Sequence, residues 1–203
     1  MNKTKSNTNL FRSIAFILVY AVLSLSLIGC TSDDATQLLD NYGYYYTNSS
    51  VTTPKGSTVA SRQYSGELSS TDYDECVAYQ EDYFPSVSVL RNPTLKYNCH
   101  SYAWYSTSSN NKHWIDYPSA YMTDGSYSYI ASATSISSIP SSVSNNSKVV
   151  WLKYNGSGYL PIHSGIKYSS TKIDSKWGMM GLYRHSQDYS PYNDDTDAIW
   201  YYK

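Results

Sequence analysis

The stretch KVVWLKYNGSGYLPIHSGIKY, residues 148–168, has the strongest structural signal in this 203-residue chain. Two runs rich in aliphatic and aromatic residues flank the turn sequence Asn155-Gly156-Ser157-Gly158, a pattern typical of a β-hairpin. Side chains alternate between the two faces of a strand, so His163, Gly165 and Lys167 are expected on one face. The hairpin predicts an antiparallel sheet in the C-terminal part of the chain.

Two helices are expected before this hairpin. Thr71 is a capping residue ahead of CVAYQEDYF, and Pro85 ends that stretch. NCHSYAWYS, residues 98–106, lies between turn signals and is the second candidate. Further strands are expected over 171–176 and 198–203. Helices early in the chain and an antiparallel sheet late predict an α+β fold.

The first 29 residues have the pattern of an export signal. A basic start with Lys3, Lys5 and Arg12 precedes an apolar run, and Leu27-Ile28-Gly29-Cys30 resembles the lipobox of bacterial lipoproteins. In such proteins the cysteine is lipidated and the preceding peptide is removed. We therefore expect a protein anchored through lipidated Cys30 to the extracytoplasmic face of the cell membrane.

The composition after this signal is that of a packed, slightly acidic domain. Hydrophobic residues make up 41% of the chain and charged residues only 15%, and tyrosine is unusually frequent. Three of the 15 basic residues lie in the signal, so 12 basic residues face 16 acidic ones afterwards, a net charge of −4. This balance argues against a nucleic-acid partner.

Residues 30–70 are rich in Ser, Thr, Asn and Gly and have no sustained apolar period, so they are expected to form a flexible tether. Tyr44 to Tyr46 are compatible instead with an extra edge strand. The folded domain is expected to span residues 71–203.

Two cysteines remain for this domain, Cys76 and Cys99, and two hypotheses follow. In an oxidising compartment they would form a disulfide closing a loop of about 23 residues and contributing roughly 3 kcal/mol. Alternatively Cys99 is a nucleophile, because a sulfur at a helix start lies near the positive end of the helix dipole, where the thiolate is favoured. His163 on the later strand would then be its base.

The segments NCHSYAWY (98–105), KVVW (148–151), HSGI (163–166) and SKWG (175–178) together resemble the CHAP class of papain-like amidases and peptidases, and the related NlpC type. The resemblance implies a papain-like α+β fold in which a cysteine at a helix start packs on a small antiparallel sheet. It also implies hydrolysis of amide bonds, often in peptidoglycan peptides, with Cys99 as nucleophile and His163 as base.

The other members of such a site are less strongly indicated. Asp174 on the following strand is preferred for orienting His163, because a carboxylate also stabilises an imidazolium, and Ser175 is the alternative. The backbone N–H of Cys99 is one expected oxyanion donor, with the side chain of Tyr97 or Asn98 as the second.

The remaining histidines do not indicate a second centre. His100 points about 100° away from Cys99 on a helix, and His185 is placed in a loop. No pair of residues has the usual spacing of zinc ligands, so neither a metal nor another cofactor is expected.

Two function classes follow from the sequence. The first is a surface-anchored cysteine amidohydrolase or peptidase acting on peptidoglycan peptides or other amide bonds. The alternative is a non-catalytic lipoprotein that binds glycans or peptides through its Tyr and Trp residues, with Cys76 and Cys99 joined in a disulfide.

Overall fold

The computed structural model describes residues 37–133 and 136–203, which belong to one compact unit. The predicted export signal and lipidation site, residues 1–29 and Cys30, lie outside the described residues. Within the described part of the chain, none of the helices has both the length and the apolar character needed to cross a membrane.

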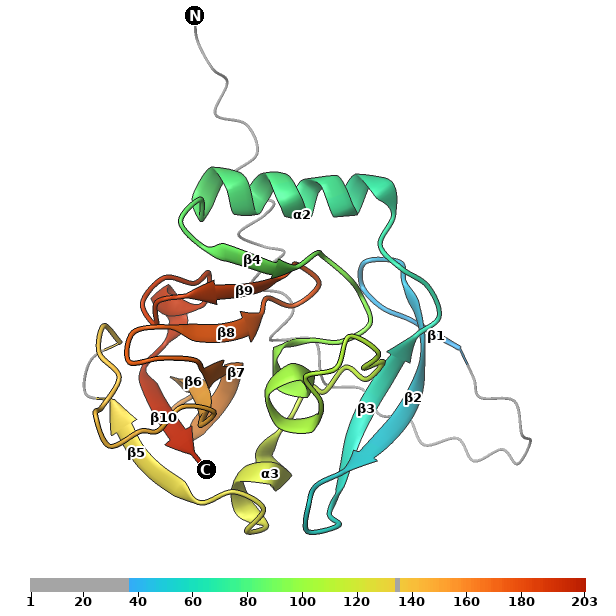
Figure 1. Ribbon diagram of the computed structural model, residues 1–203. Coiled ribbons are helices and arrows are strands. Elements are labelled where there is room, and N and C mark those ends of the chain that lie inside the picture. The colour runs from blue at the N-terminus through green and yellow to red at the C-terminus, as the bar shows by residue number, and fades with distance from the viewer. Residues whose placement is uncertain (1–36, 134–135) are drawn as a thin grey trace, which may run out of the picture. The chain divides into compact units, whose positions relative to one another are not determined.

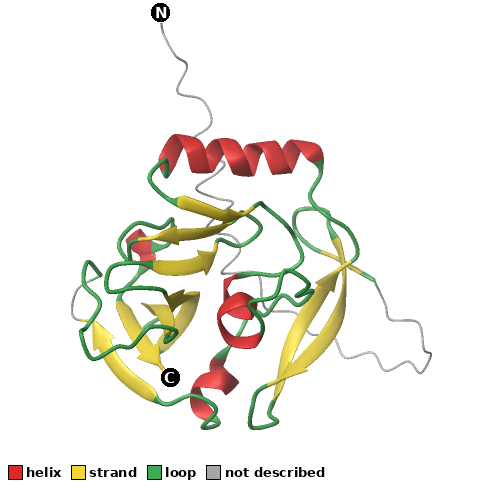
Figure 2. Cartoon of the chain, viewed as in Figure 1, coloured by secondary structure: helices red, strands yellow, loops and turns green. Residues whose placement is uncertain are grey.

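Two antiparallel sheets form most of the regular structure (Figures 1 and 2). The smaller sheet has the order β1-β2-β3 and the larger one the order β4-β9-β8-β7-β6-β10-β5. The strands of the smaller sheet are β1 (Leu38–Leu39), β2 (Tyr45–Thr52) and β3 (Thr58–Tyr64). Those of the larger sheet are β4 (Ser88–Arg91), β5 (Tyr129–Ala133), β6 (Lys148–Tyr154), β7 (Tyr159–Lys167), β8 (Ile173–Lys176), β9 (Leu182–His185) and β10 (Ala198–Tyr202). The helices are α2 (Ser70–Tyr83), the π-helical turn η1 (Ser101–Tyr105), α3 (Ser119–Thr123) and the 3₁₀ turn η2 (Asn193–Asp195).

The predicted α+β, papain-like fold is wrong, because the protein is mostly β. Among the described helices only α2 exceeds five residues. The expected flexible tether over 30–70 also fails for residues 38–64, which form β1, β2 and β3. These strands alternate Ser, Thr and Tyr with few apolar residues, so their pattern resembles a spacer. Of their apolar residues only Val51 and Val59 are fully buried.

Helix α2 was expected from its capping sequence and is confirmed, with an earlier start. The hydroxyl of Ser69 accepts a hydrogen bond from the backbone N–H of Asp72 at 3.1 Å, so Ser69 rather than Thr71 caps the helix. The helix ends at Tyr83, before Pro85, because the residue preceding a proline disfavours helical backbone. Figure 1 shows α2 alongside β4, at one edge of the larger sheet.

The hairpin of residues 148–168 is confirmed as β6 and β7. Its turn is closed by a hydrogen bond from the backbone N–H of Asn155 to the carbonyl of Gly158 at 3.0 Å. Gly156 has a φ of 93°, which an L side chain rarely adopts. A bulge separates the pair Trp151–His163 from the pair Leu152–Pro161. The expected strands near 171–176 and 198–203 are present as β8 and β10.

The helical turn η1 lies between the two sheets (Figure 1). Ala103 and Trp104 of η1 belong to one apolar cluster with buried residues of both sheets. Those residues include Val51 and Val59 from the smaller sheet and Val150, Leu152 and Tyr202 from the larger one. The core therefore fixes η1, and the residues just before it, against β6 and β7.

Strands β7 and β8 pair over only two positions, Ile166 with Asp174 and Lys167 with Ile173. Gly165 lies where the pairing ends. A Cβ atom there would be 2.7 Å from Cγ2 of Ile173 and 3.0 Å from the carbonyl oxygen of Asp174. This close approach requires glycine for steric reasons, not for its backbone angles.

We predict that Gly165→Ala lowers the free energy of unfolding by about 1–3 kcal/mol, because the added methyl group overpacks the contact between β7 and β8. Urea unfolding followed by circular dichroism measures the change. Gly158→Ala is the matched control, since a Cβ atom added at Gly158 would have no neighbouring atom within 4 Å. An unchanged stability of Gly165→Ala would contradict the steric argument.

Candidate functional site

Cys99 begins the helical turn that leads into η1, as the sequence predicts. The side-chain oxygen of Asn98 accepts hydrogen bonds from the backbone N–H groups of Ser101 at 3.1 Å and Ile115 at 3.2 Å. Its amide nitrogen donates to the carbonyl of Ile115 at 2.7 Å. Asn98 is therefore a capping residue whose side-chain oxygen and one amide N–H are bonded within the fold. Its expected role as an oxyanion donor stays a prediction.

The thiol of Cys99 is a buried, protonated group in this structure. Burial raises its pKa to about 11, and hydrogen bonds from the backbone N–H groups of Ser164 and His100 lower it less than burial raises it. Burial thus opposes the favoured thiolate that the sequence predicts. The cost of removing a charge from water exceeds the benefit of the helix start.

His163 lies on β7 with its side chain fully buried. Its imidazole stacks on the ring of Tyr192, with centroids 4.0 Å apart and planes at 10°, and contacts Trp151 at 4.9 Å. Neither ring nitrogen has a hydrogen-bond partner among the described residues. Burial, followed by the charges of the nearby His185 and His100, lowers the pKa of His163 well below its usual value. The imidazole is therefore neutral.

Cys99 and His163 come to neighbouring positions without a hydrogen bond between them. The sulfur of Cys99 accepts from the backbone N–H of Ser164, the residue that follows His163. The Ser164 hydroxyl faces η1, where it bonds Nδ1 of His100 at 2.8 Å and Nε1 of Trp104 at 3.0 Å. Because side chains alternate along β7, the His163 ring leaves the strand on the side away from the Ser164 hydroxyl. There it stacks on Tyr192, whose hydroxyl is close enough to Cys99 for the charge of one to affect the other, so Tyr192 is a common neighbour of the thiol and the imidazole.

Neither residue expected to orient His163 bonds to it. Asp174 forms a bidentate ion pair with Arg184, with N–O distances of 2.7 and 2.8 Å. Ser175 instead donates to Nε2 of His185 at 2.6 Å. The strand next to β8 on its other side is β9, so both side chains find their partners there.

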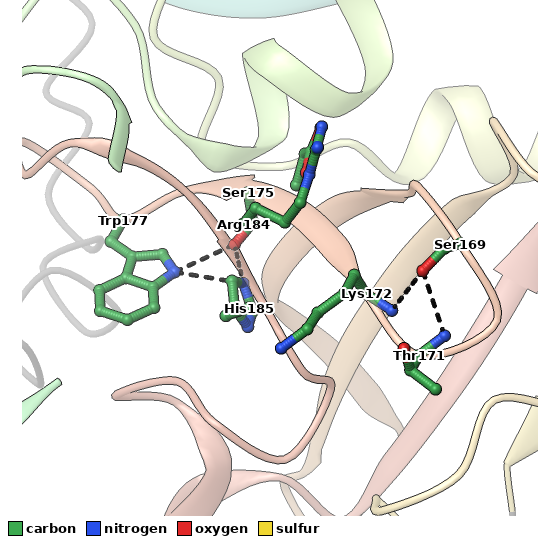
Figure 3. Close-up of polar contacts among 8 residues, drawn as sticks. Ser169, Thr171, Lys172, Ser175, Trp177, Arg184 and His185 are labelled. Carbon is green, nitrogen blue, oxygen red and sulfur yellow. Dashed lines mark hydrogen bonds and ion pairs between the residues drawn. The ribbon is translucent and has the colours of Figure 1, made fainter. Parts of the chain in front are cut away.

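Ser175, Trp177 and His185 form a closed polar network (Figure 3). Nδ1–H of His185 donates to the carbonyl of Ser186 at 2.8 Å, so Nε2 is the acceptor for the Ser175 hydroxyl. Nε1–H of Trp177 donates to the Ser175 oxygen at 3.0 Å. Burial lowers the pKa of His185 to about 4. His185, expected in a loop, ends β9 and has a structural role.

Lys176, in the SKWG segment, was not identified as a site residue from the sequence. Its side chain is fully buried, and its ammonium group donates to the carbonyl groups of Thr94, Gly178 and Met180. Burial lowers the pKa of Lys176 to about 7. Its charge favours ionisation of both Cys99 and Cys76. The sequence signal that could have identified Lys176 is a lysine within a strand whose other residues are mostly buried.

The two remaining predictions concern Tyr97 and the disulfide. The hydroxyl of Tyr97 accepts from Arg91 at 3.0 Å, and the residue is buried. Cys76 and Cys99 are both free thiols in the structure, which does not contain the disulfide expected under the alternative hypothesis. Burial raises the pKa of Cys76 to about 11 as well.

Similar proteins give no guide to the role of these residues. No model of a known protein family, no curated protein and no solved structure matches the chain. Among the residues that the structure describes, no group of three or more His, Cys, Asp or Glu is placed to hold a metal ion.

The buried histidines predict a loss of stability in acid. Burial lowers the pKa of His100 to about 3 and that of His185 to about 4, and it lowers the pKa of His163 well below its usual value. Below about pH 6.5 the unfolded chain binds protons that the folded chain does not, so the free energy of unfolding falls as pH falls. We expect about 1.4 kcal/mol per pH unit for each histidine between about pH 6 and pH 4.

Urea unfolding at a series of pH values checks this expectation. His185→Gln should reduce the slope of the free energy of unfolding against pH by the amount that corresponds to about one bound proton. This reduction is expected whatever the effect of the substitution on absolute stability. An identical slope in the variant would show that His185 is not buried in its neutral form.

Proposed function

We propose that the protein is a cysteine amidohydrolase or peptidase held at the outer face of the cell membrane through Cys30, with Cys99 as nucleophile and His163 as general base. One observation carries the proposal. His100 and His185 are buried and hydrogen-bonded, as structural histidines are. The ring nitrogens of His163 are also buried, but neither has a hydrogen-bond partner within residues 37–133 and 136–203. Such a group needs an explanation, and a role in proton transfer beside a thiol is one.

The chemistry that follows uses an uncharged resting pair. A ring nitrogen of His163 accepts the proton of the Cys99 thiol as the sulfur attacks the carbonyl carbon of an amide. The tetrahedral intermediate places its oxyanion near the backbone N–H of Cys99. Collapse breaks the C–N bond, the leaving amine takes the proton from His163, and a thioester remains. Water then hydrolyses the thioester to a carboxylate and restores the thiol.

The proposed substrates are peptide amides of peptidoglycan. The predicted export signal and lipobox support a position beside the producing cell's own wall. The net charge of −4 after the signal argues against nucleic acid and leaves wall peptides as the nearest polymer that contains amide bonds. Because Cys99 is only 5% exposed, binding of such a substrate requires that the site opens.

One further observation supports the alternative, a binding lipoprotein. Four aromatic rings follow one another across β6, β7, β10 and β5: Tyr154, Tyr159, Trp200 and Tyr129. Successive centroids are 5.4, 5.4 and 6.1 Å apart, and the three tyrosines are about half exposed. Exposed tyrosine and tryptophan rings pack against the apolar faces of ligands while their polar atoms stay in water.

We predict that Cys99→Ser and His163→Gln each lower the hydrolysis of muropeptides by a factor of about 10²–10⁴. Each change removes a group that forms or breaks a bond to hydrogen or carbon in the proposed reaction. The full chain in detergent micelles, under mild reductant, is incubated with purified muropeptides, and new amines and carboxylates are identified by mass spectrometry.

Cys76→Ser is the control, because Cys76 is a second buried thiol with a pKa raised to about 11 and has no part in the proposed reaction. It should retain rates within a few-fold of wild type. Turnover by Cys99→Ser at the wild-type rate would exclude Cys99 as nucleophile. Binding of muropeptides without turnover by the wild-type protein, reduced by Tyr159→Ala, would favour the binding lipoprotein.

A further inference from the structure

The imidazole of His163 contacts two aromatic rings, those of Tyr192 and Trp151. Tyr192 stacks on one side, nearly parallel at 10° and with centroids 4.0 Å apart. Trp151 contacts it at 4.9 Å and 53°. Since no described residue hydrogen-bonds either nitrogen, these ring contacts define the plane of the imidazole. The stack therefore fixes the plane of the imidazole, which is one part of what a hydrogen bond from a carboxylate does in a catalytic triad.

The backbone of Tyr192 is well held. Its carbonyl accepts from the Thr196 hydroxyl at 2.8 Å, which ties it across η2. Asp197, which follows η2, is hydrogen-bonded to β6, the strand beside β7. The backbone N–H of Asp197 donates to the carbonyl of Leu152 at 2.8 Å, and the Asp197 carboxylate accepts from the backbone N–H of Tyr154 at 2.7 Å. The position of the Tyr192 ring is thus built into the fold.

We propose that Tyr192 is the positioning residue for His163, in the place expected for Asp174. The proposal rests on the proposed function of Cys99 and His163. The Tyr192 ring holds the plane of the neutral imidazole, and its π face stabilises the imidazolium that forms when His163 accepts the thiol proton. Both roles belong to the aromatic ring, so the hydroxyl group of Tyr192 is not required.

A double-mutant cycle tests this role without a substrate. The rate at which iodoacetamide alkylates Cys99 at pH 7 is measured in the full chain in detergent micelles, and peptide mass spectrometry separates Cys99 from Cys76. His163→Gln is introduced into wild type, Tyr192→Phe and Tyr192→Leu. We expect His163→Gln to slow alkylation about tenfold in wild type and in Tyr192→Phe, because the neutral imidazole no longer accepts the thiol proton as the sulfur attacks.

In Tyr192→Leu the same change should have less than about a twofold effect, because the imidazole is no longer held in place. If Tyr192 only shields the site, Tyr192→Leu speeds alkylation but leaves the effect of His163→Gln intact, and the proposal is overturned. An equal loss in Tyr192→Phe and Tyr192→Leu would assign the role to the hydroxyl and overturn it too. No effect of His163→Gln in wild type would also overturn it.

Turnover and spectroscopy give two further measurements. In the muropeptide assay, Tyr192→Leu should lower kcat by about 10- to 100-fold with little change in KM, and Tyr192→Phe should restore it. The ring current of residue 192 should shift the His163 ring protons in NMR spectra of wild type and Tyr192→Phe, but not of Tyr192→Leu. Absence of turnover together with an intact alkylation cycle would reject the proposed function and leave the positioning role standing. A wild-type kcat in Tyr192→Leu would reject the positioning role alone.

Discussion

The arrangement of the site depends on the alternation of side chains along β7. Ser164 faces η1 and bonds His100 and Trp104, which holds the helical turn against the sheet. His163, one residue earlier, faces the other side and contacts the rings of Trp151 and Tyr192. A register shift of one residue between β6 and β7 would exchange these faces. The register therefore places the His163 ring against Tyr192, whose hydroxyl also lies near Cys99.

Burial then decides the charge state of the site. The backbone N–H groups and the charge of Lys176 favour a Cys99 thiolate, yet burial raises the thiol pKa to about 11. Burial also lowers the pKa of Lys176 to about 7, although three carbonyl groups accept from its ammonium. Desolvation thus outweighs local hydrogen bonds and neighbouring charges here. Cys99 and His163 are therefore both uncharged in the structure.

Elements with strong local signals were predictable from sequence, and elements stabilised by distant partners were not. The hairpin 148–168 and the helix α2 have turn residues, caps and apolar residues within their own segments. Strands β2 and β3 contain mostly Ser, Thr and Tyr and bury only a few residues against η1. Because they lack an apolar alternation, β2 and β3 resemble a tether. Without these strands, the sequence predicts an α+β fold for a protein that is mostly β.

The sequence by itself determined which residues begin the helical turn at Cys99, and that His163 and Ser164 lie on opposite faces of a strand. Both follow from local rules of capping and alternation. Only the tertiary structure decided that Asp174 pairs with Arg184, that Ser175 bonds His185, and that Tyr192 covers His163. These choices depend on which strand lies beside β8 and on where a distant segment crosses the sheet. Local sequence does not encode such long-range neighbours, because the same polar side chain bonds whichever partner the fold brings within reach.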